Sequence, residues 1–103
     1  MITSTLNKGF QLTFENGLTI SVQFGAGNYC ANRSLSVEYG AELKQEITSC
    51  IDAEIAIWDN SDKMFNFGNG NGLQLERITP DEVAIWIDKV RRAKNLETIK
   101  KEL

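Results

Sequence analysis

The sequence has 103 residues, of which 42% are hydrophobic and 24% are charged, and its formal net charge is −3. This length and composition predict one globular domain over residues 1–103. The acidic balance argues against nucleic acid and anionic membrane surfaces as partners, because proteins that bind phosphate backbones or anionic lipids usually present basic surfaces.

The first predicted elements are two strands that form a hairpin. Residues 1–8 are polar, and we expect them to be poorly ordered. Apolar residues then alternate with polar ones over 10–14 and again over 18–24, which is typical of half-buried strands. Asn16-Gly17 between them predicts a two-residue type I′ turn, in which both central residues have positive φ. The apolar side chains of both strands should then share one face of the sheet.

Further strands are predicted after a loop at 25–33. Alternation over 35–39 indicates a short strand, whereas residues 41–50 could form one or two helical turns. A well-patterned strand follows at 53–58. Residues 65–67 should provide the return strand of a second hairpin, and 73–77 a last short strand.

The C-terminal part begins with a clear helix start signal. Thr79 is a good N-cap residue, Pro80 follows at the first helical position, and Glu82 completes a capping box. The helix should run to about Ala93, and its apolar stripe consists of Val83, Trp86, Ile87 and Val90. A shorter helical stripe follows at Leu96, Ile99 and Leu103. The order of elements predicts an α+β fold: an antiparallel β-sheet built from hairpins, then one or two C-terminal α-helices packed on one face.

The residues needed for common catalytic and metal sites are missing. The chain has no histidine, which removes the commonest general base and every Ser-His or Cys-His arrangement. Two cysteines without histidine do not complete the usual structural zinc site within one chain. Cys30 is either a small buried residue or a reactive thiol. We therefore predict no catalytic residue, no metal site and no cofactor, and a protein that is not an enzyme.

The loop at 25–33 is the first candidate binding site. It lacks the third glycine of a dinucleotide-binding fingerprint. The Asn28 amide, the Tyr29 ring and the Arg33 guanidinium could bind a ligand, and arginine suits phosphate oxygens. The alternative is a structural turn with an ordinary surface arginine.

The glycine-rich loop at 68–72 is the second candidate. Phe65 and Phe67 before it could stack on a base, while Asn69 or Asn71 could bond to a base or ribose. The alternative is a flexible connection into the last strand.

Arg91 and Arg92 near the end of the predicted helix are the third candidate. Either arginine could reach an anionic ligand or a partner chain. The alternative is a pair of solvated charges at the negative end of the helix.

Several motifs resemble a widespread group of small proteins encoded by phages and prophages. The motifs are Thr13-Phe14-Glu15-Asn16-Gly17, Ser21-Val22-Gln23-Phe24-Gly25, Gly27-Asn28-Tyr29-Cys30, Asn32-Arg33, the strand from Ala53 to Asp59 and the helix start from Pro80 to Val83. Proteins of this group look similar to anti-defence proteins, among them the Thoeris anti-defence sponges, which sequester a signal of the cyclic ADP-ribose type.

This resemblance implies a phage anti-defence protein that acts in the host cytoplasm. It would bind and sequester a nucleotide-derived immune signal without catalysis, as a homo-oligomer. The expected ligand contacts are Asn28, Tyr29, Arg33, Phe65, Phe67, Asn69, Asn71, Arg91 and Arg92. The alternative is a protein–protein inhibitor of a host defence complex, similar to an anti-CRISPR protein, with an acidic surface that includes Glu38, Glu42 and Glu46.

Overall fold

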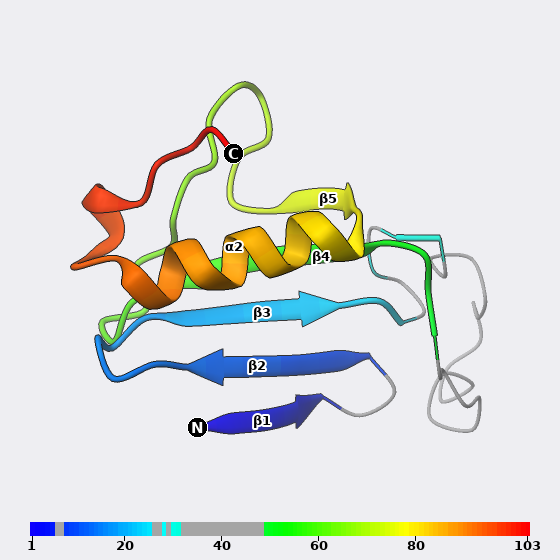
Figure 1. The fold of residues 1–103 in the computed structure, drawn as a ribbon, viewed down its shortest axis with the longest axis horizontal. Helices are drawn as coiled ribbons and strands as arrows, with labels where there is room; N and C mark the ends of the chain where they lie inside the picture. The colour runs from blue at the N-terminus through cyan, green and yellow to red at the C-terminus, as the bar shows by residue number, and fades with distance from the viewer. Residues whose placement is uncertain (6–7, 26–27, 29, 32–48) are drawn as a thin grey trace.

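A computed structural model of the chain describes residues 1–5, 8–25, 28, 30–31 and 49–103. Five antiparallel strands form one sheet in the order β1-β2-β3-β4-β5, and helix α2 packs on one face of it (Figure 1). The predicted α+β fold is confirmed. The elements are β1 (Ile2–Thr5), β2 (Gly9–Thr13), β3 (Thr19–Gln23), β4 (Ala53–Trp58), β5 (Leu75–Ile78), α2 (Pro80–Arg92) and the 3-10 helix η1 (Leu96–Thr98).

The hairpin of β2 and β3 has the predicted register but a different turn. Phe10 pairs with Val22 and Leu12 with Ile20, so the apolar sets share one face. The Phe14 amide donates to the Leu18 carbonyl oxygen (2.9 Å), and the Phe14 carbonyl oxygen accepts from the Gly17 amide (3.0 Å). Gly17 has a positive φ of 85°, but Asn16 does not. The loop is therefore the longer hairpin loop that ends in a left-handed glycine, and the type I′ prediction is wrong.

The Asn16 side chain explains this turn, because it joins the hairpin to helix α2. Its Nδ2 donates to the carbonyl oxygens of Val90 (2.9 Å) and Ala93 (2.8 Å) at the C-terminus of the helix. The Val90 oxygen also accepts from the Ala93 amide at 3.3 Å. Its Oδ1 accepts from the Leu18 amide at 3.0 Å. One amide thus sets both the turn and the position of the helix C-terminus.

The N-terminal residues include an edge strand. Residues 2–5 form β1, which pairs antiparallel with β2 from Ile2↔Leu12 to Thr5↔Gly9. The Met1 ammonium group donates to the Thr13 carbonyl oxygen at 2.8 Å. The expected disorder does not hold for residues 2–5, because an edge strand gains ladder hydrogen bonds without needing apolar alternation.

The second predicted hairpin is replaced by a different pairing. The turn after β4 is present, with the Asp59 carboxylate accepting from the Ser61 and Lys63 amides at 2.8 and 3.0 Å. Its return strand amounts to one bridge, between Trp58 and Met64. The chain then leaves the sheet, and β5 pairs with β4 instead, with Ala53 opposite Ile78. The return-strand prediction for 65–67 is therefore wrong. The strand expected at 35–39 lies outside the described residues, as does 41–48 of the ambiguous segment 41–50.

Helix α2 follows its predicted signals closely. The Thr79 hydroxyl accepts from the Glu82 amide (3.2 Å), and the Glu82 carboxylate accepts from the Thr79 amide (3.0 Å). Trp86 and Val90 are buried against the sheet. The second predicted helical stripe forms only the single turn η1. Two of its three apolar residues, Leu96 and Ile99, are buried, and Leu103 is exposed. Among the described residues, no helix has the length and apolar character needed to cross a membrane.

The core lies between the apolar face of the sheet and α2. Its buried members are Leu18, Ile20, Val22, Ala53, Ile55, Ile57, Phe65, Phe67, Ile78, Trp86, Val90, Leu96 and Ile99. The helix runs lengthwise over β3 and β4, while β1 and β2 lie to one side of it (Figure 1). Ile2 on β1 is therefore 80% exposed, and Phe10 and Leu12 on β2 are only half-buried.

Candidate functional site

A basic hollow lies at the C-terminal end of α2. It has a volume of about 270 Å³, and Ala93, Thr98 and Ile99 line it together with three cationic side chains, Lys89, Arg92 and Lys100. The capped turn at 95–98 brings Lys100 back beside the last turn of the helix, because the Asn95 side chain accepts from the Thr98 amide. In an acidic chain, three cations around one hollow form a local positive region.

Lys89 is the least exposed of these cations. Its ammonium lies 4.2 Å from the centre of the Trp86 ring and donates to the Glu102 carbonyl oxygen. Burial lowers the pKa of Lys89, and the Lys100 ammonium lowers it further, against the opposite effect of the Glu102 carboxylate. Burial is the main cause of this shift, and an anion in the hollow would favour the charged form of Lys89.

Arg91 and Arg92 share one carboxylate. Arg91 contacts Asp88 at 2.6 Å and Arg92 contacts it at 3.0 Å. The Arg91 hydrogen bond, helped by Arg92, lowers the pKa of the Asp88 carboxyl. Only Arg92 lines the basic hollow, so the two predicted arginines have different surroundings.

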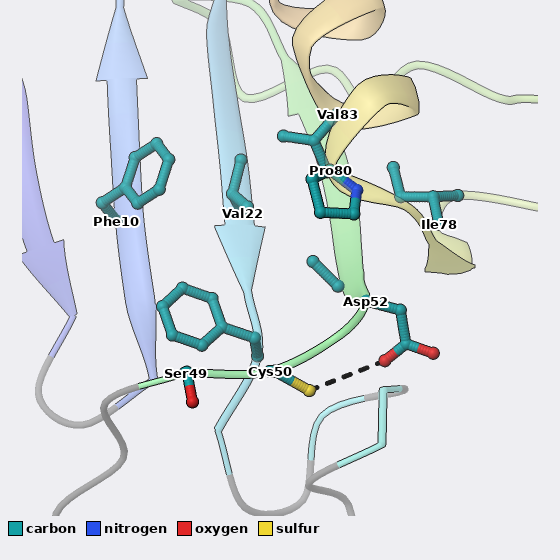
Figure 2. Close-up of a pocket in the computed structure, with 10 residues that line it drawn as sticks. Phe10, Val22, Ser49, Cys50, Asp52, Ile78, Pro80 and Val83 are labelled. Carbon is teal, nitrogen blue, oxygen red and sulfur yellow. Dashed lines mark hydrogen bonds between the residues drawn. The ribbon is translucent and has the colours of Figure 1, made fainter.

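An apolar cavity of about 260 Å³ lies near the other end of α2 (Figure 2). Its walls come from β2, β3, β4, β5 and the first turns of the helix, and polar groups occur at one end. The lining residues are Phe10, Val22, Phe24, Ser49, Cys50, Asp52, Ala53, Ile78, Pro80 and Val83. The cavity exists because α2 begins at Pro80 and leaves the adjoining apolar face of β2 and β3 only partly covered.

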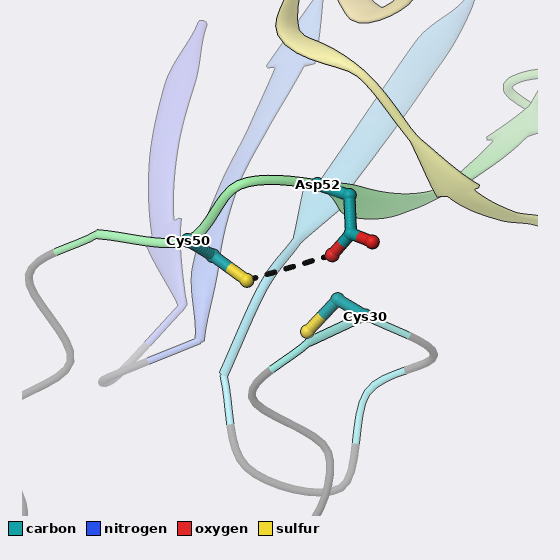
Figure 3. Close-up of side chains that lie close together, drawn as sticks. All are labelled: Cys30, Cys50 and Asp52. Atoms are coloured by element: carbon teal, nitrogen blue, oxygen red, sulfur yellow. Dashed lines mark hydrogen bonds between the residues drawn. The ribbon is translucent and has the colours of Figure 1, made fainter.

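Two thiols and a carboxylate meet beside this cavity (Figure 3). One ligand atom from each of Cys30, Cys50 and Asp52 lies within 4.8 Å of the others. Cys30 is 1% exposed, whereas Cys50 and Asp52 are half-buried. Sequence reasoning missed this group because the cysteines are far apart in the chain. One feature of the sequence could have indicated it: Cys30 follows β3, and Cys50 precedes β4. Because β3 and β4 are antiparallel neighbours, the end of β3 and the start of β4 lie at the same end of the sheet.

The predicted loop at 25–33 is described only in part. The Asn28 side chain accepts from the Gly25 amide at 3.0 Å and thereby closes its own turn. Tyr29 and Arg33 lie outside the described residues. Asn28 follows β3 in the chain, shortly after Phe24, which lines the apolar cavity.

The two aromatic rings that precede the second predicted loop are largely buried, although Phe65 lines a hollow of about 330 Å³ with Lys63, Asn66 and Lys101 among others. Phe65 and Phe67 are 5% and 3% exposed and pack edge-on to each other, with ring centres 5.0 Å apart. The Phe67 ring also meets Trp86 at 5.1 Å. Both rings are core residues, because the chain turns inward after Met64. Asn69 and Asn71 are exposed on the glycine-rich loop at 68–72 itself.

The seven predicted contacts that the structure describes do not line one common hollow. Pro80 lines the cavity, and the rise of an α-helix places Arg91 roughly 17 Å further along α2. Of the predicted residues that the structure describes, Arg92 lines the basic hollow and Phe65 lines the hollow beside Lys63 and Lys101.

Comparison of the chain with protein-family models, with curated proteins and with solved structures gave no match.

Proposed function

We propose that this chain is a non-catalytic binding protein that sequesters a nucleotide-derived signal, of the cyclic ADP-ribose type that the phage resemblance implies. In this proposal the protein is phage-encoded, acts in the host cytoplasm and forms homo-oligomers. The observation that supports a phosphate-bearing ligand is the basic hollow formed by Lys89, Arg92 and Lys100. Lysine and arginine form charge-assisted hydrogen bonds with phosphate oxygens, and such bonds are stronger than neutral ones.

The size of the hollow bears on how a ligand would be held. Pockets that enclose drug-sized ligands usually measure about 300–1,000 Å³, and this hollow of about 270 Å³ is slightly smaller. It suits the phosphates and an adjoining sugar, with Ala93 and Ile99 as an apolar floor. We propose that a second copy of the chain covers the rest of the ligand.

The direct test is ligand capture. The protein is incubated with cyclic ADP-ribose isomers, freed of unbound ligand and heated, and the released ligand is measured. Arg92→Ala and Lys100→Ala should each weaken binding by about tenfold, the loss of roughly 1.4 kcal/mol that one charged contact can supply. Arg91→Ala is the matched control, because Arg91 shares Asp88 with Arg92 but does not line the hollow. Failure to capture any nucleotide signal at micromolar concentration would reject the proposal.

A second candidate is a protein–protein inhibitor, and the edge strand β1 favours it. Ile2 on this strand is 80% exposed and Met1 before it is 86% exposed, and the edge of a sheet can pair with a strand of another protein. Pull-down of a host protein, lost in Ile2→Lys, would support this function. If the inhibitor instead binds its host protein through an acidic surface, reversing the charges of Glu38, Glu42 and Glu46 should abolish the pull-down. These three residues lie outside the described part of the chain.

A further inference from the structure

We propose that Cys30, Cys50 and Asp52 form a binding site for a thiophilic divalent cation such as Zn²⁺. Both cysteines carry thiols, and one ligand atom from each of the three residues lies within 4.8 Å of the others (Figure 3). The fold creates this arrangement: Gln23 pairs with Glu54 across β3 and β4, so the segment after β3 and the segment before β4 meet at one end of the sheet.

The observed separation fits tetrahedral coordination. Zn–S and Zn–O bonds of about 2.3 and 2.1 Å imply a sulfur–oxygen distance of about 3.6 Å in a tetrahedral site. The Cys50 Sγ and an Asp52 carboxylate oxygen are 3.6 Å apart. Two thiolates on one zinc would be about 3.8 Å apart, so Cys30 needs to move by no more than about 1 Å from the observed upper limit of 4.8 Å.

The surroundings already orient one ligand. The Ala31 amide donates to the Asp52 carboxylate at 2.6 Å, and such outer hydrogen bonds fix the position of metal ligands. The Cys30 thiol donates to the Gly25 carbonyl oxygen at 3.7 Å. This weak bond is given up when the thiol loses its proton to bind the metal, so binding of one cation should release about two protons from the two cysteines.

Three protein ligands leave a fourth position for water or another donor. Cys50 and Asp52 also line the apolar cavity, so this position can be reached from the cavity (Figure 2). The site lies near the opposite end of α2 from the basic hollow and does not depend on the nucleotide proposal.

The experiment is a titration of the reduced full-length chain with Co²⁺ and then with Zn²⁺. We expect one Co²⁺ per chain, with a thiolate-to-metal charge-transfer band and the visible bands of a tetrahedral centre, and displacement of Co²⁺ by Zn²⁺. Bound Zn²⁺ should also protect the half-buried Cys50 from alkylation, which mass spectrometry measures on the unmodified sequence. This protection assay needs no variant and therefore does not depend on whether substitutions at the buried Cys30 fold.

Variants assign the ligands. Cys30→Ser and Cys50→Ser should weaken Zn²⁺ binding at least 100-fold, and Asp52→Asn should weaken it 10-fold or more. Asp62→Asn, in the exposed turn after β4, should change nothing. A chain that binds no Co²⁺ when reduced, or that binds it equally well in Cys50→Ser, would overturn the proposal. The proposal would also be overturned if Cys50 of the reduced chain were alkylated equally fast with and without Zn²⁺.

Discussion

Asn16 is the residue whose role changes most between sequence and structure. The Asn-Gly pair predicts only a turn, yet the Asn16 amide also bonds to two carbonyl oxygens at the end of α2. Asn16→Ala should lower the free energy of unfolding by about 2 kcal/mol, because the partly buried carbonyl oxygens of Val90 and Ala93 lose the hydrogen bonds from the Asn16 amide. Urea denaturation measures this loss.

Asn16→Asp separates the two halves of that role. It keeps the acceptor for the Leu18 amide but replaces the donor with a charge at the negative helix end, so it should be no more stable than Asn16→Ala. Asn71→Ala, on an exposed loop, is the control. Equal stability of Asn16→Ala and Asn71→Ala would contradict this role.

Gly9 is the second residue with a clear prediction. Its φ is +150°, and a Cβ at this position would lie 2.0 Å from the Val22 carbonyl oxygen. Gly9→Ala should therefore cost roughly 3 kcal/mol or more, because backbone of β3 must move. Gly70→Ala is the comparison: it has a φ of +82° but open space, and should cost about 1 kcal/mol. Similar melting temperatures for the two variants would refute the steric explanation.

At the scale of elements, the last turn of α2 has a charge arrangement that predicts a pH effect. Arg91 and Arg92 lower the pKa of Asp88 in the folded chain. A lowered carboxyl pKa stabilises the fold above the unfolded value of about 3.9, and the contribution is lost as pH falls through the lower folded value. The melting temperature of the native sequence should therefore fall more steeply between about pH 5 and pH 2 than that of Asp88→Asn.

Salt provides an independent check of this interpretation. The ion pairs are about half exposed, so 1 M NaCl should screen them and bring the two pH profiles together. Asp62→Asn serves as the exposed-carboxylate control. Parallel profiles for Asp88→Asn and the native sequence at low salt would show that the pairs do not contribute to stability.

At the scale of the whole molecule, the open edge at β1 is the feature most relevant to assembly. Ile2 is 80% exposed on β1, which is an edge strand among the strands that the structure describes, and such edges readily pair with another strand. If copies of the chain assemble through this edge, native mass spectrometry should show oligomers for the native sequence and monomers for Ile2→Lys. Ile85→Lys, at a position 44% exposed on α2, should remain oligomeric. Oligomers that persist in Ile2→Lys would exclude this edge as the interface.

Local patterns in the sequence determined much of the scaffold. The alternation around Phe10 and Ile20, the strand at 53–58 and the capping box at Thr79 all form as predicted. These features depend on interactions between residues close in the chain, or on a periodicity that assigns each side chain to a face. They therefore need no knowledge of distant partners.

Only the tertiary structure decided which distant residues meet. Phe65 and Phe67 enter the core because β5, and not their own segment, pairs with β4. Lys100 joins Arg92 because the chain folds back after α2. Cys30 and Cys50 come together because β3 and β4 are antiparallel neighbours. Long-range pairing depends on the balance of packing over the whole sheet, which no local pattern contains, so the sequence by itself determined the elements and the tertiary structure determined the candidate sites.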